Sequence, residues 1–350
     1  MQRDSSGDGS LIYQAAASEA NQVEASVLGN STVTIRDLGA VVIAGAGCVS
    51  VDGNTVECGD IDDAFLMLGD LNDTLSWADQ GFAALELLVE VQGGAGADTL
   101  GFCARCPGFI KGQEGNDRLS GPTLYGGNGD DVLGGDDLLT VRRFAGGAGD
   151  DVLSGSDRFD VLNGGSGNDS ITAAGGSDNI FPGDGNDTVD AGAGDHDRIN
   201  YNLPGPVTVN LRTGIATGAG TDTITGAEDV WGSKRGDLLI GDRNANLLNG
   251  REGPDVIRGG AGADRLFGGA RNLRGADKVY GGPGDDMLDG ANGNDFLAGG
   301  LGLDTLLAGR GDDVLRSRDG ERDIVNGQRG HDRARVDRGL DAVRGVEKLL

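Results

Sequence analysis

Residues 281–316 carry four successive copies of one nine-residue unit and read GGPGDDMLD-GANGNDFLA-GGLGLDTLL-AGRGDDVLR. The shared pattern is G-G-x-G-x-D-x-U-x, in which U is a large aliphatic residue. Repetition at a fixed short period is typical of solenoid proteins, in which each repeat packs mainly on its neighbours. We therefore expect one small structural unit to recur along the chain.

The same spacing extends over most of the sequence. Acidic residues stand nine positions apart from Asp151 to Asp187, and an aliphatic residue follows each of them two positions later. A second series begins at Asp237 and resumes in register after a four-residue insertion near residues 271–273. Complete copies of the unit begin at Gly126, Gly146, Gly164, Gly259, Gly281 and Gly299, and near-copies at Gly112, Gly250, Gly290 and Ala308.

The residue types of this unit suit an ion-binding turn followed by a short strand. Glycine adopts positive φ and lets chains approach closely, so the first six residues can form a tight loop. Such a loop directs carbonyl oxygens inward, and the Asp at its sixth position adds a carboxylate. These are the ligands that Ca²⁺ prefers. In the x-U-x strand, side chains alternate between faces, so the aliphatic side chain points inward.

The nonapeptide resembles the calcium-binding repeat of RTX proteins, also called the hemolysin-type repeat. The resemblance covers about residues 93–200 and 232–334. It implies an all-β fold, a right-handed parallel β-roll (a β-solenoid) in which two units form one coil and Ca²⁺ lies between the loops of successive coils. The implied metal ligands are Asp98, Asp117, Asp131, Asp151, Asp169, Asp187, Asp255, Asp264, Asp277, Asp286, Asp295, Asp304 and Asp313.

The acidity of the chain also indicates metal binding. The formal net charge is −27, and 46 of the 56 acidic residues are Asp. This charge argues against nucleic acid and anionic membrane surfaces as partners, whereas hard cations with oxygen ligands fit it. We expect roughly eight Ca²⁺ ions. Without them the chain has little core and much self-repulsion, so we expect it to fold only when Ca²⁺ binds.

The two edges of the first array are expected to differ. Because two units form one coil, each loop pairs with the loop two units away. Loops ending at Asp151, Asp169 and Asp187 keep a glycine at the fourth position, whereas the alternating loops, such as the one ending at Asp160, lie in broken contexts. We therefore predict one well-occupied calcium column and a poor one on the opposite edge. In residues 281–316 both edges should bind.

The pattern divides the chain into five parts. Residues 1–92 show alternation typical of short strands and are expected to form a β-rich N-terminal cap, and residues 93–200 form the first array. Residues 201–231 are expected to continue the solenoid with longer, metal-free coils. Residues 232–316 form the second array, and residues 317–350 a degenerate repeat and C-terminal cap.

The four cysteines fall into two close pairs. Cys48 and Cys58 flank a turn between strand-like runs, which favours a disulfide across a hairpin. Cys103 and Cys106 form a C-x-x-C between repeats, where a structural disulfide is favoured over free thiols, and catalysis or zinc is the weakest alternative. Disulfides indicate an oxidising compartment, so we expect a secreted, extracellular protein.

Neither a membrane span nor a signal peptide is visible in the sequence, so export requires a signal that has been trimmed or another route. The sequence contains no H-E-x-x-H motif and no G-x-S-x-G elbow with a partner His. We therefore predict a non-enzymatic calcium-binding protein with a structural, adhesion or interaction role. One alternative is a non-catalytic secretion and folding module of a larger secreted enzyme or toxin. Another is a solenoid that has lost calcium binding, against which the many intact loops argue.

Overall fold

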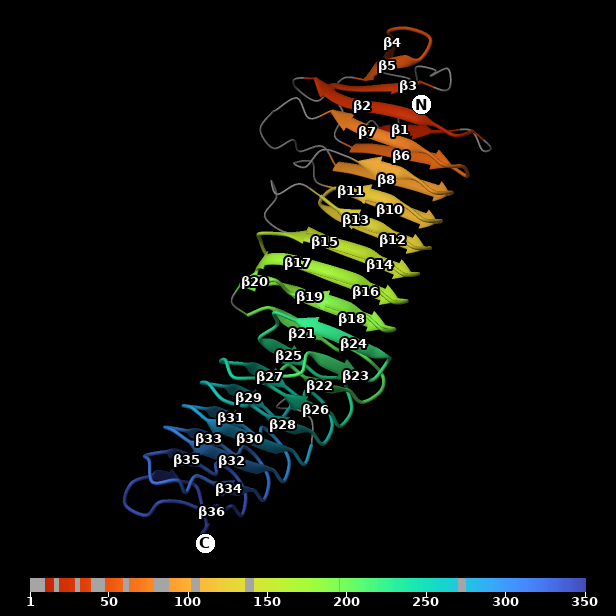
Figure 1. The fold of residues 1–350 in the computed structure, drawn as a ribbon. Helices are drawn as coiled ribbons and strands as arrows, with labels where there is room; N and C mark the ends of the chain where they lie inside the picture. Colours follow the sequence, from red (N-terminus) through yellow and green to blue (C-terminus); the bar gives the residue numbers. More distant parts are fainter. Residues whose placement is uncertain are drawn as a thin grey trace. The chain divides into compact units, whose positions relative to one another are not determined.

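The computed structural model describes residues 10–15, 19–28, 32–38, 48–58, 63–78, 88–101, 108–135, 142–194, 196–269 and 275–350. Within these ranges every regular element is a β-strand. The chain divides into two compact units, Met1–Gly175 and Gly176–Leu350, each of which is described by itself. In both units short strands stack in parallel (Figure 1), which confirms the predicted all-β parallel solenoid.

In the first unit, consecutive strands of the solenoid alternate between two parallel sheets, so each coil adds one strand to each sheet (Figure 1). The first sheet follows the order β1 (Ser10–Gln14), β6 (Asp63–Gly69), β8 (Leu88–Ala95), β10 (Gly108–Glu114), β12 (Thr123–Asn128), β14 (Arg142–Ala148) and β16 (Asp160–Ser166). The second follows β7 (Thr74–Ala78), β9 (Thr99–Gly101), β11 (Arg118–Ser120), β13 (Val132–Gly134), β15 (Val152–Ser156) and β17 (Ser170–Gly176).

Between β1 and β6 the chain forms antiparallel pairs of strands. They are β2 (Gln22–Leu28), β3 (Thr32–Asp37), β4 (Cys48–Ser50) and β5 (Thr55–Cys58). Strand β2 also pairs in parallel with β7, which joins this β-rich region to the solenoid. Parallel coils already include β6 and β7, which lie before residue 93.

The hairpin of β4 and β5 carries the predicted disulfide. Cys48 and Cys58 are directly paired residues of the two strands, and their sulfur atoms are bonded with the Cα atoms 4.2 Å apart. The prediction for this pair is therefore confirmed. Cys103 and Cys106 lie outside the described residues.

The second unit repeats the two-sheet arrangement. One sheet follows β18 (Asn179–Asp184), β21 (Arg198–Asn200), β25 (Asp229–Trp231), β27 (Leu247–Asn249), β29 (Arg265–Phe267), β31 (Met287–Asp289), β33 (Thr305–Leu307), β35 (Ile324–Asn326) and β37 (Ala342–Arg344). The other contains β26 (Leu238–Ile240), β28 (Val256–Arg258), β30 (Lys278–Pro283), β32 (Phe296–Leu301), β34 (Val314–Arg316), β36 (Arg333–Arg335) and β38 (Lys348–Leu349).

Residues 201–231 include an antiparallel strand between strands that pair in parallel with the solenoid. Strand β24 (Thr221–Thr225) pairs in parallel with β19 (Thr188–Asp190), and β22 (Thr208–Asn210) pairs in parallel with β26. Between them, β23 (Ile215–Thr217) is antiparallel to both β22 and β24. The segment therefore reverses direction twice within the sheet.

One aliphatic side chain per short strand forms the core. In β15, Leu153 is buried whereas its neighbour Val152 is exposed, as the x-U-x pattern predicts. Strand register stacks these side chains directly on one another from coil to coil. One such ladder in the first unit contains Leu100, Leu119, Leu133, Leu153 and Ile171.

Candidate metal centre

The glycine loops take a backbone shape that only glycine adopts without strain. In residues 146–151, Gly147 has a φ of 123° and Gly149 a φ of 132°. A Cβ atom on Gly147 would lie 2.1 Å from the carbonyl oxygen of Gly127 in the preceding coil. The same pair of positive φ angles recurs at Gly127 and Gly129, Gly165 and Gly167, Gly260 and Gly262, Gly282 and Gly284, and Gly300 and Gly302.

Several degenerate loops keep this backbone shape although their sequence departs from the pattern. Non-glycine residues occupy the second position with positive φ in four loops, namely Gln113 (87°), Arg251 (73°), Ala291 (65°) and Gln328 (64°). Ala174 (75°) and Gly176 (123°) have the same signs in the loop ending at Asp178, which the sequence analysis had treated as broken. Since positive φ is uncommon for non-glycine residues, the surrounding coils hold these loops in shape.

The sixth-position Asp side chains of the first unit form a column where the chain passes from the first sheet to the second. After Asp73, each Oδ1 atom accepts a hydrogen bond, 2.8 Å long, from the backbone N–H of the preceding Asp in the column. The column contains Asp73, Asp98, Asp117, Asp131, Asp151 and Asp169. These bonds fix one oxygen of each carboxyl group and orient the other.

The second carboxyl oxygen is left without a protein donor along most of this column. The Oδ2 atoms of Asp73, Asp98, Asp117, Asp131 and Asp151 are buried, and they have no hydrogen-bond partner in the described structure. Burying a charged oxygen in this way is unfavourable unless a proton or a cation meets it. A column of such oxygens is therefore a candidate cation site.

The first glycine of each unit leaves space beside that oxygen. A Cβ atom on Gly146 would lie 2.1 Å from Oδ2 of Asp151 and 2.6 Å from the carbonyl oxygen of Gly164 in the next coil. Carboxylate and carbonyl oxygens thus converge where a side chain would otherwise stand. The same contact with the carboxylate recurs between Gly93 and Asp98, Gly112 and Asp117, Gly126 and Asp131, Gly250 and Asp255, Gly281 and Asp286, and Gly299 and Asp304.

The second unit has two such columns, one at each turn between its sheets. One contains Asp255, Asp277, Asp295, Asp313 and Asp332, and the other Asp264, Asp286, Asp304 and Asp323. All of these Oδ2 atoms are buried without a hydrogen-bond partner among the described residues.

The insertion in the second array leaves its columns intact. The backbone N–H of Asp255 reaches Oδ1 of Asp277, 22 positions later, at 2.8 Å, while the next step, to Asp295, spans 18 positions at 2.9 Å. The columns therefore continue in register. Residues 270–274, which include the insertion, lie outside the described part of the chain.

Burial destabilises the charged form of these carboxyl groups. It raises the pKa of Asp131 and Asp151 to about 7, and the pKa of Asp255 and Asp295 to about 8. Neighbouring carboxylates of the same column add a smaller upward shift of the pKa. A divalent cation at this position would oppose both effects by supplying positive charge.

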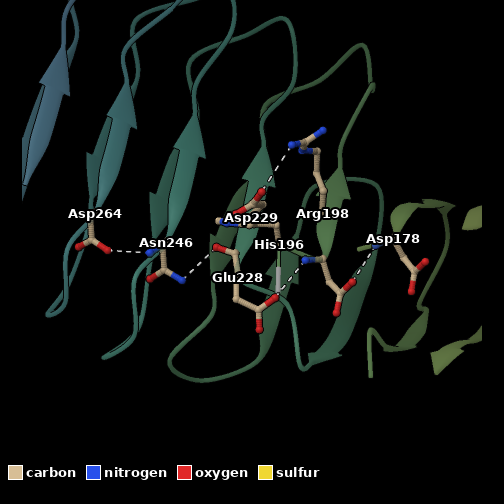
Figure 2. Close-up of polar contacts among 8 residues, drawn as sticks. Asp178, His196, Arg198, Glu228, Asp229, Asn246 and Asp264 are labelled. Atoms are coloured by element: carbon tan, nitrogen blue, oxygen red, sulfur yellow. Dashed lines mark hydrogen bonds and ion pairs between the residues drawn. The ribbon is translucent and has the colours of Figure 1, made fainter. Parts of the chain in front are cut away.

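One column of the second unit is interrupted near its start (Figure 2). Asp178 donates its N–H to Oδ1 of Asp197 at 2.7 Å, and Asp197 donates to Oε2 of Glu228 at 3.0 Å. Asn246 then donates its side-chain amide to the Glu228 carbonyl at 3.0 Å and its N–H to Oδ1 of Asp264 at 2.8 Å. A longer acid and a neutral amide therefore replace two Asp residues, which weakens this segment as a cation site.

The donor set fits a hard cation held by main chain and carboxylates together. Among the described residues, no three His, Cys, Asp or Glu side chains gather as a metal cluster. Any ion between successive loops would need carbonyl oxygens in addition to the column carboxylates. Oxygen-only ligand sets are typical of Ca²⁺, whereas zinc sites usually use Cys or His.

The other predicted metal residues lie in these columns, and Asp187 pairs in the same way with Asp222. Its N–H reaches Oδ1 of Asp222 at 3.1 Å, and the Tyr201 hydroxyl donates to Oδ2 of Asp222 at 2.7 Å. A protein donor therefore meets the second oxygen of Asp222, the carboxyl oxygen that has no protein donor in the columns. Conversely, Asp73, Asp323 and Asp332 belong to the columns but were not among the predicted metal ligands. Each stands two positions before a buried residue of the solenoid core, which is the spacing of the other column residues.

The matches to known proteins agree with this geometry. The sequence profile of the RTX calcium-binding nonapeptide repeat (4 copies) matches residues 123–138, 145–180, 175–195, 240–270, 273–297, 289–321 and 298–334. The fold is a β-solenoid, and the repeats that it carries support calcium binding. The chain carries several copies of the RTX calcium-binding nonapeptide repeat.

No curated protein matches the chain. In the described ranges, no helix is long and apolar enough to cross a membrane.

Proposed function

We propose that the protein is a secreted calcium-binding β-roll that takes up several Ca²⁺ ions, roughly eight, and folds on binding them. The observation that carries this proposal is the set of buried Asp Oδ2 atoms that face no donor in the described structure. The repeat family and the parallel solenoid support calcium binding independently of that observation.

The glycine and Asp residues of each loop would have different roles in binding the ion. Glycines at the second and fourth positions turn the chain, and the first glycine leaves room beside the carboxylate. The Oδ1 atom of the Asp ties its coil to the preceding one through a backbone N–H, as Asp169 does with Asp151 at 2.8 Å. The Oδ2 atom and loop carbonyls remain to bind Ca²⁺, which supplies the positive charge that the column lacks.

Coupling of folding to calcium follows from the small size of the core. Each short strand buries one aliphatic side chain, as β13 and β31 illustrate. Without cations the columns add repulsion between buried carboxylates, so the metal-binding free energy becomes folding free energy. Cytosolic Ca²⁺ is scarce and extracellular Ca²⁺ is usually millimolar, so the chain would stay unfolded inside the cell and fold outside. The disulfide between Cys48 and Cys58 supports an oxidising compartment.

We further propose a structural, adhesion or interaction role without catalysis, through a protein or cell-surface partner that the sequence does not identify. The alternative is that the chain acts as the secretion and folding module of a larger secreted enzyme or toxin. The genomic sequence upstream of residue 1 separates these roles, because a catalytic domain encoded there in frame would favour the alternative.

Calcium binding is tested by isothermal titration of the calcium-depleted chain with Ca²⁺, with Mg²⁺ in excess as the competitor. We expect several ions per chain and little competition, because Mg²⁺ demands octahedral geometry and keeps its waters. Absence of binding at millimolar Ca²⁺ would refute the proposal.

A further inference from the structure

Two loops share the pattern G-S-x-R-x-D in place of the glycine pattern. They are residues 155–160, GSDRFD, and residues 232–237, GSKRGD. Serine occupies the second position and arginine the fourth, where the other loops have positive φ. None of these serines and arginines is among the described non-glycine residues with positive φ. The two loops therefore have a different backbone shape.

In the second of these loops, the protein itself satisfies both oxygens of the Asp. The N–H of Ser233 donates to Oδ2 of Asp237 at 2.6 Å, and the Ser233 hydroxyl donates to Oδ1 at 2.8 Å. The N–H of Val207 also donates to Oδ1 at 2.8 Å, while the N–H of Arg235 donates to the Ser233 hydroxyl oxygen at 3.0 Å. Ser233 and Asp237 are both buried.

The first loop repeats the central part of this arrangement in the other unit. The N–H and hydroxyl of Ser156 donate to Oδ2 of Asp160 at 2.7 and 3.0 Å, and the N–H of Arg158 donates to the Ser156 hydroxyl oxygen at 3.3 Å. Serine thus contacts the oxygen that is left without a donor in the glycine loops. In both loops the serine N–H donates to Oδ2 of the Asp and the arginine N–H to the serine hydroxyl oxygen, whereas the serine hydroxyl donates to Oδ2 in the first loop and to Oδ1 in the second. The shared contacts make this a recurring loop type.

An arginine from a neighbouring coil accompanies each of these loops. Arg142 is buried with 1% of its surface exposed, and its backbone pairs with Asp160 in the sheet. Burial raises the pKa of Asp160, and the charge of Arg142 opposes that rise. Near the other loop, Nη1 of Arg251 donates to the carbonyl oxygen of Gly232 at 3.3 Å. Each loop therefore has a positive charge supplied by the chain.

Building on the calcium function proposed above, we propose that these two loops are serine latches that close without Ca²⁺. The serine N–H and hydroxyl take the place of the ion at the carboxylate, and a neighbouring arginine supplies the charge. In the first unit the latch lies on the edge opposite the calcium column, because Asp160 leads into β16 and Asp151 into β15. In the second unit it heads a column, since Asp237 donates its N–H to Oδ1 of Asp255 at 2.7 Å.

The test compares calcium content and melting temperature in the full chain for Ser156→Ala, Ser233→Ala and Asp286→Asn. The matched control is Ser154→Ala, because Ser154 is an exposed serine of the same strand region. We expect both latch variants to bind as many Ca²⁺ ions as the wild type, but to melt lower than the control by about 2–4 °C. Asp286→Asn, in a glycine loop, should bind fewer ions.

Two results would contradict the proposal of serine latches. Loss of a bound ion in S233A or S156A would show that the serine loop belongs to an occupied site. Melting temperatures equal to that of S154A would show that the hydrogen bonds of Ser156 and Ser233 do not stabilise the fold. A wild-type chain that binds no Ca²⁺ would instead refute the calcium function. The serine latches would then be tested only by the melting temperatures of S156A and S233A relative to S154A.

Discussion

Replacing the first glycine of one repeat should remove a single calcium site. In Gly146→Ala the new Cβ atom would stand 2.1 Å from Oδ2 of Asp151 and 2.6 Å from the carbonyl oxygen of Gly164, whereas real Cβ atoms essentially never approach closer than 3.0 Å. The methyl group would displace the oxygens that face the ion. The backbone at Gly146 does not have positive φ, so the effect is steric and local.

The size of the effect follows from binding linkage. With free Ca²⁺ at one hundred times the dissociation constant, one site stabilises the folded state by about 2.7 kcal/mol. A unit of this size loses about 2–4 °C of melting temperature per kcal/mol, so Gly146→Ala should melt about 5–11 °C lower in saturating Ca²⁺. The control is Gly134→Ala, since a Cβ there meets only the Ser154 Cβ at 3.9 Å.

The assay is differential scanning calorimetry in Ca²⁺, combined with metal analysis of the dialysed protein. Gly146→Ala should bind fewer Ca²⁺ ions than Gly134→Ala, which should match the wild type. Equal calcium content and equal melting temperatures for the two variants would refute the assignment of the carboxylate oxygen as a calcium ligand.

The remaining predictions concern charge and the disulfide. Because the folded-state pKa values of Asp255 and Asp295 are raised to about 8 from an ordinary 3.8, protons compete with Ca²⁺, and calorimetric titration should show tighter binding at pH 8 than at pH 6. Because of these raised pKa values, the folded state binds more protons than the unfolded state from pH 4 to 8. The stability of any structure that persists in chelator should therefore fall as the pH rises from 4 through 8. Unfolding that does not depend on pH would contradict this. Asp295→Asn should bind fewer Ca²⁺ ions, yet any structure retained in chelator should unfold at higher denaturant than in the wild type, because the variant removes a buried carboxylate. Replacing Cys48 and Cys58 by Ser should destabilise the N-terminal hairpin by about 2–3 kcal/mol without changing calcium content, and a reduced number of bound ions would show that the hairpin supports the columns.

The columns could be predicted from sequence because their period is built into the chain. A unit of nine residues brings every second Asp to the same edge, so the positions of Asp286 and Asp304 follow from counting alone. The alternation of x-U-x likewise predicts the buried Leu288 and Leu306. Local spacing was sufficient because parallel coils place each residue directly on its counterpart.

The exceptions could not be read from spacing, because they depend on partners far along the chain. Asp222 lies 35 residues from Asp187, whose N–H it accepts, and the Tyr201 hydroxyl donates to its second oxygen. Likewise, Asp237 has the same spacing to Asp255 as a calcium-type pair, but Ser233 makes its surroundings different. Which oxygens remain open is therefore decided by side-chain contacts.

Some backbone conformations also could not be predicted from the sequence. Ala174 and Gln328 adopt positive φ although neither is glycine, so the stacked coils impose the loop conformation on unfavourable residues. The antiparallel strand β23 is a further case, because an alternating pattern predicts a strand but not its direction.

The most direct measurement is far-ultraviolet circular dichroism of the full chain, together with sedimentation velocity, first in excess EDTA and then with millimolar Ca²⁺ restored. We predict an expanded coil in EDTA and a compact β-structured protein after calcium addition. A chain that is equally compact and equally resistant to heat in both conditions would contradict the claim that bound cations stand in for a large hydrophobic core.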